Sequence, residues 1–202
     1  MQPENDLGDW TNEMEKTLKG NGISKQVFNN GALPEDQYRK IFDTLEQHNG
    51  LNVMVCSEAY PNWPKQCVIY ADLVIVTTSF SRDTDLYQIE KTLDIYSKNI
   101  TNKKTYMVFL HEGDAAIPNQ TSRWLSQRKI RLHLHVRCNH TGDIKRFCRV
   151  ISNQAVGLVL GSGETKGFAH MGAVKALLDA GVEIDFVGGT SAGGTLWYTD
   201  GL

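Results

Sequence analysis

The sequence predicts an α/β protein with a parallel-sheet scaffold. Short apolar runs alternate along the chain with longer segments in which apolar residues recur at helical spacing. Gly, Asn and Pro residues separate these segments and predict turns. Such alternation is typical of parallel sheets, because two parallel strands need a crossover connection that is usually a helix.

The first 150 residues supply most of these segments. A helix is expected over residues 8–20, where Trp10, Met14 and Leu18 share one face. Pro34 begins a second helix, which extends to about residue 47. The same reasoning predicts strands over residues 51–56, 73–78, 106–110 and 132–136, and helices over residues 83–99, 119–128 and 143–152.

A domain boundary is expected near residues 150–155, where Asn153 and Gln154 precede a glycine-rich strand. We therefore expect one α/β region over residues 1–150 and a second region over residues 155–202. The sequence contains no internal repeat that would indicate a solenoid.

A glycine-rich loop follows the apolar run 156–160, which is suited to a buried strand. Behind the loop, apolar residues at helical spacing predict a helix that begins near residue 168 and ends before Gly181. The start of a helix binds anions, and in a hydrolase the anion would be the tetrahedral oxyanion. The candidate oxyanion-loop residues are Gly161, Ser162, Gly163, Glu164, Thr165, Lys166 and Gly167.

A Gly-x-Ser-x-Gly motif occupies residues 189–193, directly after the apolar run 184–187. After a strand, this motif predicts a nucleophile elbow, a sharp turn that lifts a serine out of the backbone. Ser191 is therefore the candidate nucleophile of an acyl-transfer reaction. The other candidate elbow residues are Gly189, Thr190, Ala192 and Gly193.

Together, the loop and the elbow resemble the opening of a patatin-like phospholipase domain, and in particular the neuropathy target esterase branch of lysophospholipases. The residues that carry this resemblance are the runs 158–161 and 187–191 with Gly167, His170 and Gly172. Upstream, the runs 61–67, 71–76, 123–125 and 132–138 resemble the region that precedes the esterase domain in that branch. The resemblance implies that residues 155–202 are the first strand, loop, helix, strand and elbow of a patatin-like α/β hydrolase domain.

The resemblance implies a serine esterase of lipid metabolism that hydrolyses carboxylic esters of lysophospholipids or phospholipids through a Ser–Asp dyad. Ser191 would attack the ester, and Lys166 would support the loop or lie near the lipid head group. The family aspartate stands far downstream in an Asp-Gly-[Ala/Gly] motif, and Asp200-Gly201 is too close to Ser191 to take its place. We therefore expect that this chain is catalytically incomplete as given. No cofactor is implied.

Two departures from the family pattern favour an alternative, an inactive remnant or interaction module. Ser162 and Glu164 interrupt a loop that is usually an unbroken run of glycines, and the Glu164 carboxylate would repel a developing oxyanion. Trp197 and Tyr198 also stand where small residues are usual.

Composition excludes several classes of protein. The chain has 202 residues and a net charge of −2, which provides no basic footprint for nucleic acid. No apolar run approaches the ~20 residues that span a bilayer, and the polar amino terminus is no secretory signal. Four scattered cysteines indicate reduced thiols. We expect a cytoplasmic protein that binds a lipid ester and makes peripheral contact with membranes.

Two further kinds of site stay open as less favoured alternatives. Side chains of the types that bind zinc occur at His133, His135, Cys138, His140 and Cys148. Their spacing does not match ordinary zinc motifs, so no metal site is expected. Gly161 and Gly163 could open a dinucleotide loop, although the acidic residue expected at the end of the next strand is missing. Ser191 could also be a simple helix cap.

Overall fold

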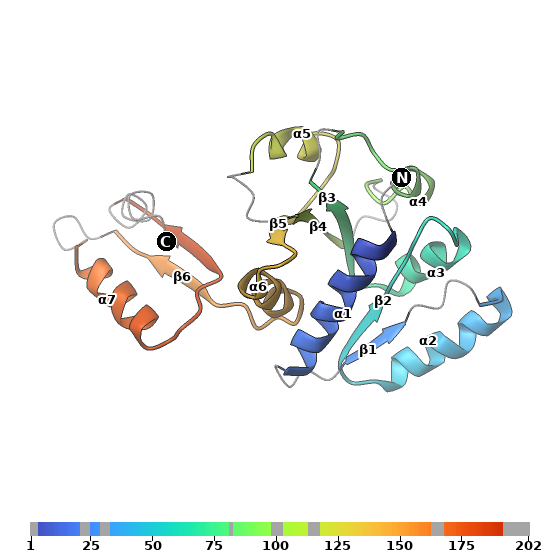
Figure 1. Ribbon diagram of the computed structural model, residues 1–202, viewed down its shortest axis with the longest axis horizontal. Helices are drawn as coiled ribbons and strands as arrows, with labels where there is room; N and C mark the ends of the chain where they lie inside the picture. The colour runs from blue at the N-terminus through green and yellow to red at the C-terminus, as the bar shows by residue number, and fades with distance from the viewer. Residues whose placement is uncertain are drawn as a thin grey trace. The chain divides into compact units, whose positions relative to one another are not determined.

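The computed structural model describes residues 4–20, 25–28, 33–80, 83–97, 103–112, 118–162 and 168–191. The chain divides into two compact units, Met1–Phe147 and Cys148–Leu202. All strand pairs among the described residues are parallel, and helices separate the paired strands along the chain (Figure 1). The predicted α/β class with parallel strands is therefore confirmed.

The first unit begins with a helix and a two-stranded sheet. Strand β1 (Lys25–Phe28) pairs with β2 (Leu51–Met54), and Lys25 lies opposite Leu51. The helical elements around this sheet are α1 (Glu4–Gly20), the 3-10 helix η1 (Glu35–Gln37), α2 (Tyr38–Gln47) and α3 (Asn62–Tyr70). Helices α2 and α3 share a small core that is formed by Tyr38, Phe42, Trp63 and Cys67.

A three-stranded sheet forms the larger part of the first unit. Its order is β3–β4–β5, with β3 at Leu73–Ser79, β4 at Lys104–His111 and β5 at Leu132–Arg137. The central strand β4 is almost fully buried from residue 107 to its end, as expected for a parallel strand that is covered on both faces. Met107, Phe109 and Trp124 form the core on one side. The helices of this part are α4 (Gln88–Leu93), α5 (Thr121–Leu125) and α6 (Thr141–Ile151).

The described residues of the second unit form the end of α6, a two-stranded parallel sheet and α7. Strand β6 (Gly157–Leu160) pairs with β7 (Phe186–Gly189), and α7 (Phe168–Asp179) connects them. Burial is sparse here, because Val159 is 80% exposed and Phe186 is 36% exposed. The predicted order of strand, helix, strand and serine turn is confirmed, with residues 163–167 of the loop outside the described part.

Three local expectations differ from the structure. Strand β1 and helix α3 were not expected, and the helix predicted over residues 83–99 is limited to α4. It ends at Asp94, which has a left-handed backbone with a φ of 48°. Strand β7 begins at Phe186, two residues later than expected, and includes Gly188 and Gly189.

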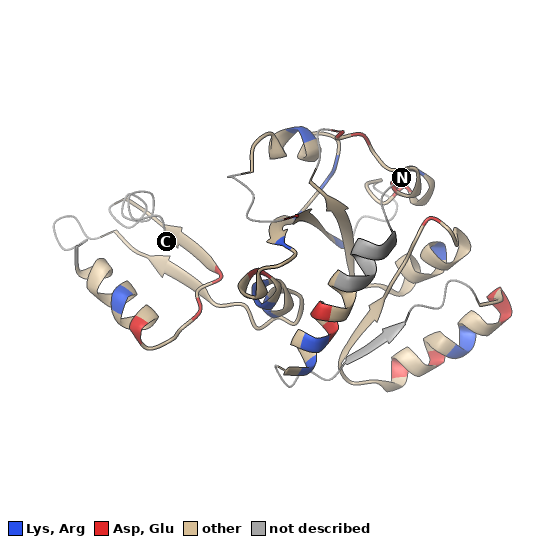
Figure 2. Cartoon of the chain, viewed as in Figure 1, with Lys and Arg blue, Asp and Glu red and all other residues tan. Residues whose placement is uncertain are grey.

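Among the helices that the structure describes, none combines the length and the apolar character that a membrane span requires. Acidic and basic residues occur together on α2 and α7 (Figure 2). Both helices therefore lack a face of a single charge.

Candidate active site

The two strands of the second unit end side by side. Leu160 is the register partner of Gly189, and the backbone N–H of Thr190 donates to the carbonyl of Leu160 over 3.1 Å. Gly161 and Ser191 therefore leave the same edge of the sheet. The carboxyl edge of a parallel sheet is the usual place for ligand and catalytic groups in α/β proteins.

Ser191 has the backbone geometry of a sharp turn. Its φ is 53°, in the left-handed region that residues with a Cβ rarely occupy. The residue follows β7 after a single intervening residue, Thr190. A strained serine directly after a strand is the geometry that the Gly-x-Ser-x-Gly motif predicts for a nucleophile elbow.

The first residue of the candidate oxyanion loop is held by the next helix. The carbonyl of Gly161 lies 3.0 Å from Nε2 of His170 in the first turn of α7, and the Nε2–H tautomer donates this bond. His170 therefore holds the first residue of the loop to α7. Gly161 and Ser162 are described, whereas Gly163, Glu164, Thr165, Lys166, Gly167, Ala192 and Gly193 lie outside the described residues.

At the opposite edge of the same sheet, Asp185 aligns the two strands. Its side chain is fully buried and accepts a hydrogen bond from the N–H of Val156 over 2.9 Å. Its own N–H donates back to the carbonyl of Val156 over 2.8 Å. These reciprocal bonds fix the register of β6 and β7, and thus the relative placement of Gly161 and Ser191.

Arg149 neutralises the buried carboxylate. Its Nη2 and Nε lie 2.6 Å and 2.9 Å from the two Asp185 oxygens, and its Nη1 also contacts Glu183. Hydrogen bonding to Asp185 raises the pKa of Arg149, so the guanidinium stays charged beside this carboxylate. Asp185 cannot serve Ser191 as a base, because the extended strand between them spans about 20 Å at ~3.3 Å per residue.

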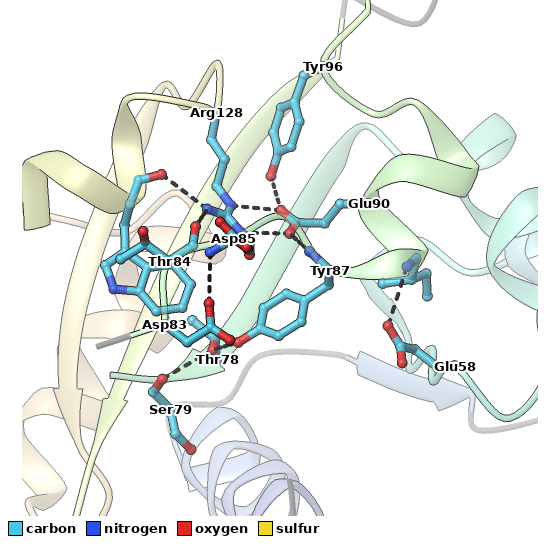
Figure 3. Close-up of polar contacts among 12 residues, drawn as sticks. Glu58, Thr78, Ser79, Asp83, Thr84, Asp85, Tyr87, Glu90, Tyr96 and Arg128 are labelled. Carbon is cyan, nitrogen blue, oxygen red and sulfur yellow. Dashed lines mark hydrogen bonds and ion pairs between the residues drawn. The ribbon is translucent and has the colours of Figure 1, made fainter. Parts of the chain in front are cut away.

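A buried charge pair also lies in the first unit, and the sequence analysis did not predict it. Arg128 and Glu90 are both buried, with side chains 0% and 1% exposed (Figure 3). Their contacts are bidentate, at 2.8 Å from Nε to Oε1 and 2.7 Å from Nη2 to Oε2. The residues are 38 positions apart, so no local motif connects them.

All five N–H donors of Arg128 have acceptors. Besides Glu90, the guanidinium donates to the carbonyls of Thr84, Trp124 and Asp85 at 2.8 Å, 3.2 Å and 2.8 Å. Glu90 also accepts bonds from the Tyr87 N–H at 2.7 Å and the Tyr96 hydroxyl at 2.5 Å. Burial and this carboxylate raise the pKa of Tyr96. Because Arg128 has no remaining donor for a ligand, the pair is a structural clamp.

A histidine pair marks the carboxyl edge of the three-stranded sheet. His111 Nε2 lies 2.8 Å from His135 Nδ1, and Thr121 Oγ1 lies 3.2 Å from His135 Nε2. Burial, with the neighbouring histidines, lowers the pKa of His135 to about 4. Burial also lowers the pKa of His111. The pair is therefore neutral at pH 7.

The zinc alternative gains no support from the described part of the chain, which contains no cluster of three potential metal ligands. Nδ1 of His140 instead lies 2.9 Å from the Asp143 carboxylate. Arg137 binds the same carboxylate at 2.8 Å. These groups together hold the end of β5 to the start of α6.

Two family models match the chain. A family model described as the Neuropathy Target Esterase family P-loop like domain matches residues 7–166. A second model, described as patatin-like phospholipase, matches residues 158–196 and therefore includes Gly161 and Ser191. No solved structure matches the chain.

Curated relatives carry related names. The chain is 28% identical to Neuropathy target esterase sws of Drosophila mojavensis, in an alignment that covers 88% of this chain. It is 30% identical to the human Patatin-like phospholipase domain-containing protein 6, in an alignment that covers 65% of this chain. It is 29% identical to Lysophospholipase NTE1 of Yarrowia lipolytica, again with 65% of this chain covered.

The chain spans 14%, 11% and 13% of the lengths of these three relatives, respectively. Its two family matches follow one another along the chain and overlap at residues 158–166. The first of them covers well over half of the 202 residues. The chain therefore belongs to the Neuropathy Target Esterase family.

Proposed function

We propose that Ser191 is the nucleophile of a lipid ester hydrolase and that the loop from Gly161 to Gly167 forms its oxyanion hole. One observation carries this proposal: Ser191 occupies a left-handed turn at the end of β7, beside Gly161 at the end of β6. This arrangement brings a nucleophile and the start of a glycine loop to one sheet edge. A plain helix cap does not require the left-handed backbone.

In the proposed reaction, Ser191 Oγ attacks the ester carbonyl carbon and forms a tetrahedral intermediate. Backbone N–H groups of the loop stabilise the oxygen anion, and collapse of the intermediate releases the alcohol. Water then hydrolyses the acyl-serine and frees the fatty acid. The base is an aspartate of a Ser–Asp dyad, supplied from outside residues 1–202, and the reaction needs no cofactor.

The proposed substrates are lysophospholipids and phospholipids. The Yarrowia lipolytica relative is named a lysophospholipase, and the patatin-like match covers both proposed site segments. We further propose that residues 1–150 form a separate α/β domain and that residues 155–202 open the esterase domain. Such a protein acts in the cytoplasm in peripheral contact with a membrane, where its substrate resides.

The test is turnover of lysophosphatidylcholine by a protein that carries these residues within a complete patatin-like domain. Ser191→Ala should lower kcat by roughly 10⁴-fold or more, as for other nucleophile deletions. Ser126→Ala is the matched control, because Ser126 lies in the first unit and only caps a local carbonyl. Residues 1–202 alone should show no turnover that depends on Ser191. Equal activity of Ser191→Ala and the control would reject Ser191 as the nucleophile.

The alternative is an interaction module without chemistry. The sequence feature that favours it is Glu164, which places a carboxylate in a loop meant to hold an anion. This alternative predicts that the complete protein is inactive and that Glu164→Gly does not create activity.

A further inference from the structure

Gly161 and His170 stand on either side of the candidate oxyanion loop. Gly161 is the first residue of this loop, and His170 follows its last residue, Gly167, by three positions. Side chains of a helix tilt toward its amino end, so a residue in the first turn of α7 can reach back to the end of β6. Nε2 of the half-buried His170 lies 3.0 Å from the Gly161 carbonyl oxygen. This bond therefore closes the loop at its base.

The same bond sets the direction of one backbone N–H group. The Gly161 carbonyl and the Ser162 N–H belong to one peptide group, and the described residues contain no cis peptide bond. In a planar trans peptide, the C=O and N–H bonds point in opposite directions. Because His170 binds the carbonyl, the Ser162 N–H points away from His170. Rotation of this peptide group would break the bond to His170.

The preceding peptide group is held by the serine turn. The N–H of Thr190, the residue before Ser191, donates to the Leu160 carbonyl over 3.1 Å. Successive carbonyls of the chain thus have different partners, the serine turn for Leu160 and α7 for Gly161. The direction of the next N–H group is therefore set relative to the turn that carries Ser191. An oxyanion hole depends on donors whose directions are fixed before the reaction begins.

We propose that His170 is a positioning residue of the esterase: its bond to the Gly161 carbonyl holds the Ser162 N–H in the direction that stabilises the oxyanion. This inference rests on the proposed function of Ser191 and adds a residue to it. His170 itself transfers no proton, because its Nε2–H is used to donate to a backbone carbonyl. Its effect is expected mainly in the transition state, where the negative charge on the substrate oxygen develops.

The first measurement uses residues 1–202 and needs no enzyme activity. Nitrogen-15 NMR spectra of the imidazole rings show which ring nitrogen carries the proton, and loss of one set of signals in His170→Gln assigns them. At about pH 8, where an ordinary histidine is neutral, we expect His170 as the Nε2–H tautomer. The Nδ1–H tautomer would overturn the proposal, because Nε2 would then have no proton to donate.

The second measurement is turnover of lysophosphatidylcholine by a protein that carries these residues within a complete patatin-like domain. Loss of one oxyanion donor costs about 10²–10³ in kcat, and loss of its support in His170→Phe should cost roughly 10- to 100-fold. KM should change by less than about twofold, because the lost interaction belongs to the transition state. The matched control is Lys175→Met, which removes an exposed side chain of the same helix and should retain the native kcat. Circular dichroism verifies that each variant is folded.

Two further readouts separate positioning from a purely structural role. Glutamine can donate an amide N–H to the same carbonyl, so His170→Gln should retain at least about a third of the native kcat. A trifluoromethyl ketone, which forms a tetrahedral adduct with a serine, should bind His170→Phe more weakly by the factor by which kcat/KM falls. A purely structural bond would lower only the yield of folded protein, and kcat and inhibitor affinity per folded molecule would not change.

The variants also distinguish failure of this proposal from failure of the esterase function. If Ser191→Ala retains turnover, the proposed function itself is rejected, and the role of His170 with it. If Ser191→Ala abolishes turnover while His170→Phe keeps the native kcat, only the role of His170 is rejected. Losses in both His170→Phe and His170→Gln as large as in Ser191→Ala would indicate a general base and would also overturn the positioning role.

Discussion

The two compact units differ in how far they bury their parallel strands, although each pairs a buried carboxylate with an arginine. In the first unit, β4 is buried from Met107 to His111. In the second unit, α7 buries only Val174 among its described side chains, and Val159 is 80% exposed. The apolar runs of β4 and β6 look alike in the sequence, yet their burial is opposite.

An apolar run in the sequence therefore indicates that a strand is suited to burial, but it does not identify the residues that cover the strand. The run at residues 156–160 predicts a buried central strand, but the described residues of its unit leave it open. The first unit has enough helices to cover both faces of its larger sheet. Stability is therefore expected to concentrate in the first unit, and the proposed chemistry in the second.

The largest expected effect comes from breaking the clamp between Arg128 and Glu90. Arg128→Met leaves a carboxylate buried without its partner, which typically costs about 3–5 kcal/mol. Urea unfolding followed by tryptophan fluorescence measures the loss, because Trp124 packs under Arg128 at 5.0 Å. The matched control is Lys175→Met, which breaks the exposed Lys175–Asp179 pair on α7 (Figure 2) and should cost less than ~0.5 kcal/mol. Similar losses in the two variants would refute the distinction between the units.

Protease sensitivity tests the same contrast without a mutation. Because local opening follows sparse burial, trypsin should cut after Lys166 or Lys175 on the order of a hundredfold faster than within the first unit. A fragment that ends near residue 150 should survive. Mass spectrometry of a time course identifies the cuts. Equal protection through Ser191 would show that the second unit is as stable as the first.

Local signals in the sequence predicted a sharp turn at Ser191, because a nucleophile elbow depends on a few consecutive residues after a strand. The structure has a left-handed backbone there, whereas the role of Ser191 as nucleophile stays a prediction. The helix before it was predicted equally well from its apolar spacing. The base of the proposed dyad and the shape of the loop at residues 163–167 stay predictions.

Features that depend on contacts between residues far apart in the chain could not be predicted from the sequence. Leu86, Ile89 and Leu93 recur at helical spacing, but Arg128 binds the carbonyls of Thr84 and Asp85 and thereby holds that backbone outside a helix. Helix α3 was missed because Pro61 and Pro64 resemble loop residues. Proline is in fact tolerated in the first turn of a helix, where its missing N–H has no intrahelical acceptor.

The histidine pair of the first unit predicts a loss of stability in mild acid. The folded-state pKa of His135 is about 4, below its ordinary value near 6.5. The unfolded chain therefore binds more protons, and stability falls as the pH drops from about 6.5 to about 4. After discounting for solvent screening of a partly buried ring, the loss should be about 1–2 kcal/mol. Urea midpoints at several pH values measure it.

Substitution of His135 by Asn is the control for this pH dependence, because an amide can accept a hydrogen bond but does not titrate in this range. Stability of His135→Asn should vary less between pH 6.5 and pH 4 than that of the native chain. An unchanged slope would assign the effect to another group, such as His111, whose pKa burial also lowers.

The smallest expected effect concerns Glu164, which stands in the loop that we propose holds the oxyanion. In a complete patatin-like domain its carboxylate should slow the reaction. Glu164→Gly should raise kcat by about tenfold, or ~1.4 kcal/mol, with a smaller change in KM, because the repelled charge exists mainly in the transition state. Ser162→Gly is the matched control, since a serine keeps the backbone N–H that binds the anion, and it should change kcat by less than about twofold. Steady-state kinetics on lysophosphatidylcholine separates the two parameters. If kcat is unchanged in Glu164→Gly while Ser191→Ala abolishes turnover, the Glu164 carboxylate points away from the site and does not repel the oxyanion.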